Sequence, residues 1–285
     1  MADHRRDTGR GRGGDEASGH AEASDDATPH ADPIGDVGLP ADADETADAE
    51  SESRTARRPR VHVRRLDVVD TLRWSLVVLR DHRSLIGVAL AANLPAVVAA
   101  TGVSWPDPST SPEVADWVLP TYLLQMVVTV VAGGVFYLTA ADAVAERTRS
   151  LRTRVVTAVR RTPALVGTAL LLVPIVAAGL AALVLPGVYL FHRLVVAFPA
   201  CVIDGTGPVG SLTTSWRVAG GTVTKIFGVG LVYLGVGGAS TVVSGMVGGP
   251  YSVVGTAATA LVGAATYPLF GLALGHLYLE SSRNR

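Results

Sequence analysis

The sequence contains very little of several residue types on which protein chemistry commonly depends. Cys201 is the only cysteine, which excludes a disulfide framework and a metal centre built from cysteines. Lys225 is the only lysine among 24 basic residues, and this preference for arginine is typical of a GC-rich prokaryotic genome. The N-terminal region contains no apolar run, so we expect no cleavable signal peptide.

Motifs that carry enzymatic chemistry are also absent from the sequence. It has no Gly-x-Ser-x-Gly, no His-Glu-x-x-His and no phosphate-binding glycine loop that ends in Lys-Ser or Lys-Thr. The acids beside the apolar segments, Asp142 and Asp204, are not paired with another acid at a helical spacing. We therefore predict that the protein is not an enzyme and requires neither a cofactor nor a metal.

Charge divides the chain into two regions. Residues 1–52 hold 15 of the 25 acidic residues but only 4 of the 24 basic ones, and almost no large apolar side chains. Such a segment cannot bury enough apolar surface to offset its conformational entropy. We therefore expect a disordered acidic tail over residues 1–55 and a net basic membrane domain over residues 56–285.

Long uncharged stretches dominate the second region. A bilayer core about 30 Å thick requires roughly 20 apolar residues in a helix, whereas buried helices of soluble proteins are usually shorter and keep a polar stripe. We expect Pro186-Gly187 and Gly248-Gly249-Pro250 to form tight turns that divide two of these stretches. The predicted fold is all-α, a polytopic membrane helix bundle of six transmembrane helices at about 84–105, 117–140, 164–185, 188–204, 226–247 and 253–278.

The distribution of basic residues predicts the orientation in the membrane. They are concentrated before the first span and recur in every second connection, whereas the intervening connections have none. An excess of arginine and lysine marks cytoplasmic connections. We therefore predict a multi-pass plasma-membrane protein with both termini in the cytoplasm.

The connections expected in the cytoplasm have an amphipathic pattern. Apolar residues recur every three or four positions over 66–79, more weakly over 144–158, and again after Pro208. Basic amphipathic helices lie in the headgroup layer with the apolar face inward. We expect three such cytoplasmic surface helices, the third with Val209, Leu212 and Trp216 on its apolar side.

Ionisable residues at membrane depth are candidate functional groups, because an ionisable group is costly there. His192 and Arg193 lie near the start of the predicted fourth span. Arg193 either anchors the helix by extending to the headgroups or binds a ligand or ion. The candidate ligand or lipid contacts are His192, Arg193, Asp204 and Arg217.

Small residues spaced four apart occur in the last two predicted spans. They allow helix backbones to approach closely, either inside one bundle or between two copies. His276 lies near the inner end of the last span, but no second ligand is suitably spaced for a metal site. The predicted packing residues are Gly235 with Ala239 and Gly271 with Gly275.

The stretch from Leu185 to Gly221 carries a Pro-Gly-x-Tyr turn, an arginine, a proline, an acid before a Gly-Pro pair, and Ser-Trp-Arg. This order resembles the membrane domain associated with glycerophosphoryl diester phosphodiesterases and related uncharacterised polytopic membrane families. The resemblance implies a multi-span membrane module without catalytic activity, because the chemistry of those enzymes belongs to a separate soluble domain for which six spans leave no room. The matching residues are Pro186, Gly187, Tyr189, Arg193, Pro199, Asp204, Gly207, Pro208, Ser215, Trp216 and Arg217.

Two function classes follow from these patterns. The sequence favours a non-catalytic membrane module that organises or regulates a partner or the envelope. The alternative is a small-solute or lipid transporter, which would use spans kinked at Pro95 and Pro199 together with Arg193. A transporter predicts a polar cavity near mid-membrane that includes Arg193, whereas a scaffold predicts a closed apolar bundle. We expect contacts with membrane lipids and with a protein partner or a second copy, and none with nucleic acid.

Overall fold

The computed structural model describes residues 66–104, 111–249 and 252–284. The chain divides into two units, Met1–Arg58 and Pro59–Arg285, and the described residues all belong to the second. The tail predicted over residues 1–55 lies outside the described residues. So do the arginines that precede residue 66.

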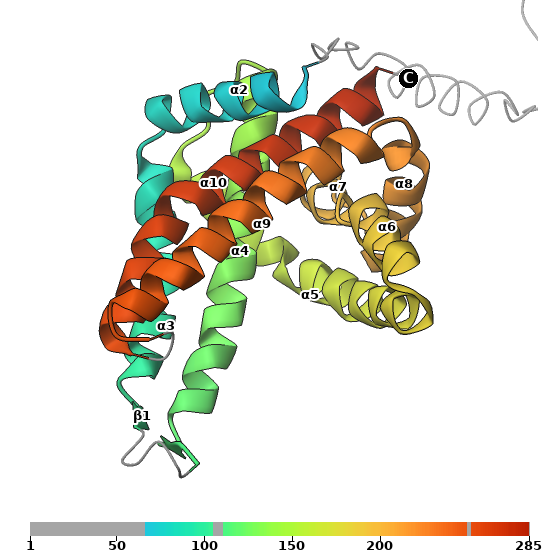
Figure 1. The fold of residues 1–285 in the computed structure, drawn as a ribbon. Coiled ribbons are helices and arrows are strands. Elements are labelled where there is room, and N and C mark those ends of the chain that lie inside the picture. Colours follow the sequence, from blue (N-terminus) through green and yellow to red (C-terminus); the bar gives the residue numbers. More distant parts are fainter. Residues whose placement is uncertain (1–65, 105–110, 250–251, 285) are drawn as a thin grey trace, which may run out of the picture. The chain divides into compact units, whose positions relative to one another are not determined.

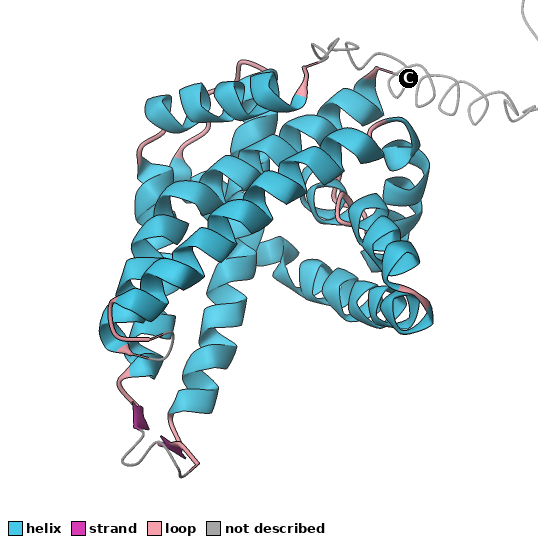
Figure 2. Ribbon diagram, in the orientation of Figure 1, coloured by secondary structure: helices cyan, strands magenta, loops and turns pink. Residues whose placement is uncertain are grey.

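The described part of the chain is almost entirely helical, as Figures 1 and 2 show, and this confirms the predicted all-α fold. Two short antiparallel strands, β1 (Val103–Ser104) and β2 (Glu113–Val114), lie between the helices Ser84–Ala100 and Val118–Val144 and were not predicted. The helices are α2 (Val68–Asp81), α3 (Ser84–Ala100), α4 (Val118–Val144), α5 (Leu151–Ala182), α6 (Val184–Leu194), α7 (Ala197–Ile203), α8 (Pro208–Val218), the 3-10 turn η1 (Ala219–Gly221), α9 (Val223–Met246) and α10 (Val253–Arg283).

The length and apolar composition of its helices identify the protein as a multi-pass membrane helix bundle. Five helical segments are long and apolar enough to cross a bilayer: α4, α5, α6 with α7, α9 and α10. A sixth is reached if α2 and α3, which meet at 94°, are counted as one broken span. By itself α3 has 17 residues, which corresponds to about 25 Å. Large apolar side chains such as Leu119, Val173 and Leu234 are exposed on the outside, as lipid-facing residues are.

The first predicted surface helix is present as α2. It meets α3 at 94°, a bend that fits a surface helix followed by a span and also the two halves of a broken span. The third is present as α8, and its predicted apolar side faces away from the other helices, with Val209 and Trp216 exposed. Small polar residues instead face the bundle, because Ser211 Oγ lies 3.1 Å from Thr168 Oγ1 of α5.

The second predicted surface helix is not a separate element. Residues 151–163 form the first part of α5, which runs unbroken through Pro163 to Ala182 and so begins thirteen residues before the predicted third span at 164–185. Ser150 caps α5 by accepting the backbone N–H of Thr153. Tight packing against α4 explains the continuity, because Ala158 is fully buried beside Gly134.

The hairpin between α5 and α6 exists, but its predicted turn residues are wrong. Leu183 alone makes the turn, with φ −165° and ψ 145°, and Pro186 and Gly187 lie in the first turn of α6. Proline is tolerated there because the first N–H groups of a helix have no partner within it. A Cβ on Gly187 would lie 2.5 Å from the backbone nitrogen of Leu180, so the close contact of α5 and α6 requires glycine.

The two prolines predicted to kink spans behave differently. Pro95 lies inside an unbroken α3, and the next backbone N–H, that of Ala96, donates to Gln125 Oε1 of α4 at 3.0 Å. Pro199 follows a break between α6 and α7 at Val195 and Val196. A proline ring clashes with the carbonyl four residues earlier, and that carbonyl belongs to Val195.

Helix α10 contacts α2, α3, α4 and α9, and Figure 1 shows α9 alongside it. Gly271 and Gly275 allow the contact with α4, because a Cβ at either position would lie 2.7 Å from the Cβ of Phe136 or Ala140. The other predicted packing pair, Gly235 and Ala239, does not lie at a contact between described helices. Gly235 and Ala239 of α9 are exposed, and a Cβ on Gly235 would meet no atom within 4 Å.

Candidate functional site

Arg193 connects α6 to α8. Its guanidinium lies 4.0 Å from the centroid of the Trp216 ring and donates to the Trp216 carbonyl at 3.2 Å. It also donates to the hydroxyl of Tyr189, one turn earlier on α6. In return, Ser215 Oγ donates to the Arg193 carbonyl at 2.8 Å. A cation over an aromatic face adds attraction to these hydrogen bonds, so the geometry is that of an anchor between two helices.

His192 faces the opposite way, toward α9. Its side chain is buried, and Nδ1 lies 2.8 Å from the carbonyl of Val188. A carbonyl only accepts, so Nδ1 carries a proton in this bond. Gly230 makes room for the ring, because a Cβ there would lie 2.8 Å from Nε2.

Asp204 ends α7 and is held by α10. It accepts a hydrogen bond from the Tyr278 hydroxyl and lies 3.3 Å from a guanidinium nitrogen of Arg283. Both partners lie in the last turns of α10, and no pattern in the sequence indicated a contact between Asp204 and this helix. Arg217 lies in the last turn of α8 with its side chain exposed.

Two ion pairs, each with a buried acid, join other helix ends, and neither was predicted. Asp142 at the end of α4 pairs with Arg154 of α5 at 2.8 Å, and both side chains are almost fully buried. Glu280 of α10 pairs with Lys225 of α9 at 2.7 Å and accepts the backbone N–H of Leu66. Lys225 and Glu280 are 55 positions apart in the sequence, so no helical spacing connects them.

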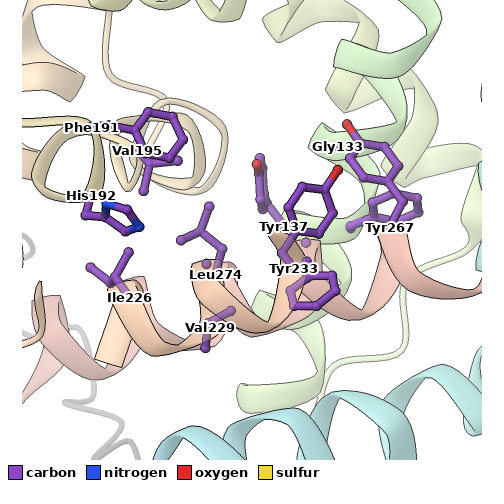
Figure 3. A pocket seen from close by; sticks show the side chains of 14 residues that line it. Gly133, Tyr137, Phe191, His192, Val195, Ile226, Val229, Tyr233, Tyr267 and Leu274 are labelled. Carbon is purple, nitrogen blue, oxygen red and sulfur yellow. The ribbon is translucent and has the colours of Figure 1, made fainter. Parts of the chain in front are cut away.

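A first cavity, of about 210 Å³, lies among α4, α6, α9 and α10. Figure 3 shows three tyrosine rings at one end, His192 and Phe191 at the other, and Leu274 between them. The surface of this cavity is predominantly apolar and aromatic. Its lining residues are Gly133, Phe136, Tyr137, Phe191, His192, Val195, Ile226, Val229, Gly230, Tyr233, Tyr267, Phe270, Gly271 and Leu274.

A second cavity, of about 340 Å³, lies among α3, α4, α9 and α10. It is polar but uncharged: amides and hydroxyls line it, and none of the described lining residues is an acid, a base or a histidine. Tyr233 and Tyr267 line both cavities, so the two adjoin. The lining residues are Asn93, Gln125, Thr129, Tyr233, Val236, Gly237, Ser240, Thr241, Thr259, Val262, Gly263, Thr266 and Tyr267.

The hydrogen bonds of the second cavity determine what it offers a ligand. Thr266 donates to the Val262 carbonyl at 2.9 Å, and Thr259 donates to the Gly255 carbonyl at 3.0 Å. Because each hydroxyl has one proton and two lone pairs, these oxygens remain acceptors. Asn93 uses Nδ2 to donate to Ala89, which leaves Oδ1 and a second amide proton. The cavity therefore presents both acceptors and donors without a charge.

Arg193 is not among the residues that line either cavity. The sequence-based hypothesis was a polar cavity that includes Arg193. The structure has a polar cavity, but Arg193 does not line it. Asn93 and Gln125 are the two amides of the polar cavity, and each lies in an apolar run of the sequence. No protein-family model, curated protein or solved structure matches this chain.

Proposed function

We propose that this protein is a membrane carrier or transporter that takes a small solute or lipid into the interior of its helix bundle. The observation that carries this proposal is the uncharged polar cavity among α3, α4, α9 and α10. It supports the transporter alternative over the closed apolar bundle expected of a scaffold. Arg193 serves as an anchor in this proposal and not as a solute ligand.

A polar cavity between the helices of a membrane protein calls for a functional explanation. A bundle that serves only to pack can fill its interior with apolar side chains, whereas polar groups at membrane depth are usually functional. Ligand sites combine apolar walls with a few placed polar groups and occur between the helices of bundles. The adjoining cavities have this composition, and together they extend from Ile226, near the start of α9, to Thr241 in its second half.

We further propose that the ends of α4 and α5 that carry Arg147, Arg149 and Arg154 face the cytoplasm. The support is the bias of basic residues toward cytoplasmic connections. The opposite connection contains Glu113 and Asp116 and no basic residue. With an even number of spans, both termini lie in the cytoplasm.

Cysteine accessibility tests the transport proposal. Thr266→Cys, in a Cys201→Ala background, places a thiol in the polar cavity, and Ala264→Cys places one on the buried side of the same helix. A membrane-impermeant thiol reagent should modify position 266 in sealed vesicles, whichever side is treated, because a carrier exposes its site to each side in turn. Position 264 should stay unmodified. Equal protection of both positions would contradict the proposal.

The second candidate is a module that organises or regulates a partner, and one observation favours it. Gly235 and Ala239 form an exposed small-residue pair on α9, the kind of surface against which another membrane helix packs closely. The proposed relation to the phosphodiesterase-associated membrane domains agrees with such a role. Disulfide crosslinking through Ala239→Cys in native membranes tests it: a crosslinked partner supports the candidate, and persistent monomer argues against it.

A further inference from the structure

We propose that the two adjoining cavities form one site for an uncharged amphiphile, a molecule with a hydroxyl- or carbonyl-bearing neutral head and a hydrocarbon tail. The tail occupies the aromatic cavity, and the head occupies the polar cavity. This inference rests on the proposed function and names its ligand class. The difference in polarity between two spaces that meet at Tyr233 and Tyr267 carries it.

The aromatic cavity suits a hydrocarbon chain. An apolar cavity of roughly 150 Å³ is sufficient to hold a benzene molecule, and this one measures about 210 Å³. Phe136, Phe270 and Leu274 contribute apolar surface along it. Transfer of each methylene from water into such a space is favourable by about 0.8 kcal/mol.

The polar cavity suits a neutral head. Asn93 and Gln125 are amides, and Thr266 keeps acceptor lone pairs because it donates to its own helix. A ligand hydroxyl can therefore both donate and accept there. An ionised head would enter without a countercharge from any described lining residue, and burying an unpaired charge is strongly unfavourable. The lining thus selects for a neutral head at this position.

The two shared tyrosines lie at the junction of tail and head. A tyrosine has an apolar ring and a polar hydroxyl, which suits a boundary between apolar and polar surroundings. Tyr267 is fixed in this position, since its hydroxyl donates to the Thr129 carbonyl at 3.2 Å and its ring packs edge-on against Phe136. Tyr233 packs in the same manner against Phe270. Figure 3 labels both shared tyrosines, together with Tyr137, at the end of the aromatic cavity opposite His192.

Equilibrium binding to the full chain in nanodiscs tests the ligand class. The probes are radiolabelled 1-monolauroylglycerol, lauroyl lysophosphatidic acid, which has the same tail and a charged head, and glycerol, which has no tail. We expect saturable one-to-one binding of monolauroylglycerol, at least about tenfold weaker binding of the charged lipid, and none of glycerol at the same concentrations. A tenfold ratio corresponds to about 1.4 kcal/mol.

Matched variants locate the binding. Thr266→Val removes a hydroxyl of the polar cavity and should weaken monolauroylglycerol binding several-fold, while Leu274→Trp should abolish it by filling the aromatic cavity. Thr121→Val is the control, because its hydroxyl also bonds one turn back but lies outside both cavities. Thermal unfolding of each variant separates lost binding from lost folding.

The possible outcomes separate this inference from the proposed function. Equal or tighter binding of the charged lipid overturns the neutral-head assignment. So does an affinity for monolauroylglycerol that is the same in Thr266→Val, Leu274→Trp and the unmodified protein. Absence of monolauroylglycerol binding, together with two-sided modification of Thr266→Cys, rejects the ligand class and leaves the carrier proposal standing. If monolauroylglycerol does not bind and Thr266→Cys is not modified from either side, both the ligand class and the carrier proposal are rejected.

Discussion

Replacing Asp142 by asparagine should destabilise the protein strongly. The Asp142 and Arg154 side chains are 2% and 4% exposed, their closest atoms are 2.8 Å apart, and Arg154 also donates to Thr139 at 3.3 Å. Removing one member of a buried pair leaves the other charge without compensation, which typically costs about 3–5 kcal/mol. Asparagine keeps the shape and one acceptor oxygen, so we expect about 3 kcal/mol.

The assay is reversible unfolding of the purified protein in mixed micelles by titration with a denaturing detergent. Arg73→Ala is the control: Arg73 pairs with Asp70 at 3.7 Å on the exposed surface of α2, where such pairs contribute at most about 1 kcal/mol. The double variant Asp142→Leu with Arg154→Met should recover most of the stability, since an apolar pair leaves no buried charge. A loss under about 1 kcal/mol for Asp142→Asn, or no recovery in the double variant, would refute this reasoning.

Three further predictions follow from the packing, the anchor and the topology. Gly271→Leu should cost at least about 1–3 kcal/mol because its Cβ clashes with α4, whereas Gly235→Leu should be neutral in the same unfolding assay. Arg193→Leu should lower stability by about 1–3 kcal/mol through loss of its ring and carbonyl contacts, yet leave monolauroylglycerol binding unchanged; the reverse result would make Arg193 a ligand. In intact cells Ser111→Cys should react with an impermeant thiol reagent and Ser150→Cys only after permeabilisation, and the opposite pattern would invert the proposed orientation.

Helix identity was predictable wherever a single local property decides it. The absence of charge over about twenty residues identified the long apolar helices, and the three-to-four-residue apolar period identified α2. Boundaries were less predictable, because contacts distant in sequence override local signals. Pro186-Gly187 has the composition of a turn, yet the close approach of Gly187 to Leu180 places both residues inside α6. Likewise α5 begins thirteen residues before the predicted span, where Ala158 packs against Gly134 of α4.

The candidate site was not predictable from the sequence as a unit. Its polar residues come from four helices between Asn93 and Tyr267, and they lie singly or in pairs within apolar runs. A lone threonine in a span usually bonds to its own helix, as Thr266 does, so nothing in the local sequence distinguishes a cavity residue from a packing residue. Arg193 was conspicuous because of its charge, but tertiary contacts with Trp216 assign it to an anchor.

A spin-label scan along α10 from Thr259 to Tyr267 tests the central claim, a polar cavity within the membrane bundle, most directly. Electron paramagnetic resonance with a water-soluble nickel chelate and with oxygen measures polar and lipid exposure at each position. The account predicts that the nickel chelate reaches labels at Thr259, Gly263 and Thr266, that oxygen dominates at the exposed Leu261, and that neither reaches Ala264 well. The claim would be contradicted if every exposed label were more accessible to oxygen than to the nickel chelate, with no three-to-four-residue period in the accessibility to nickel.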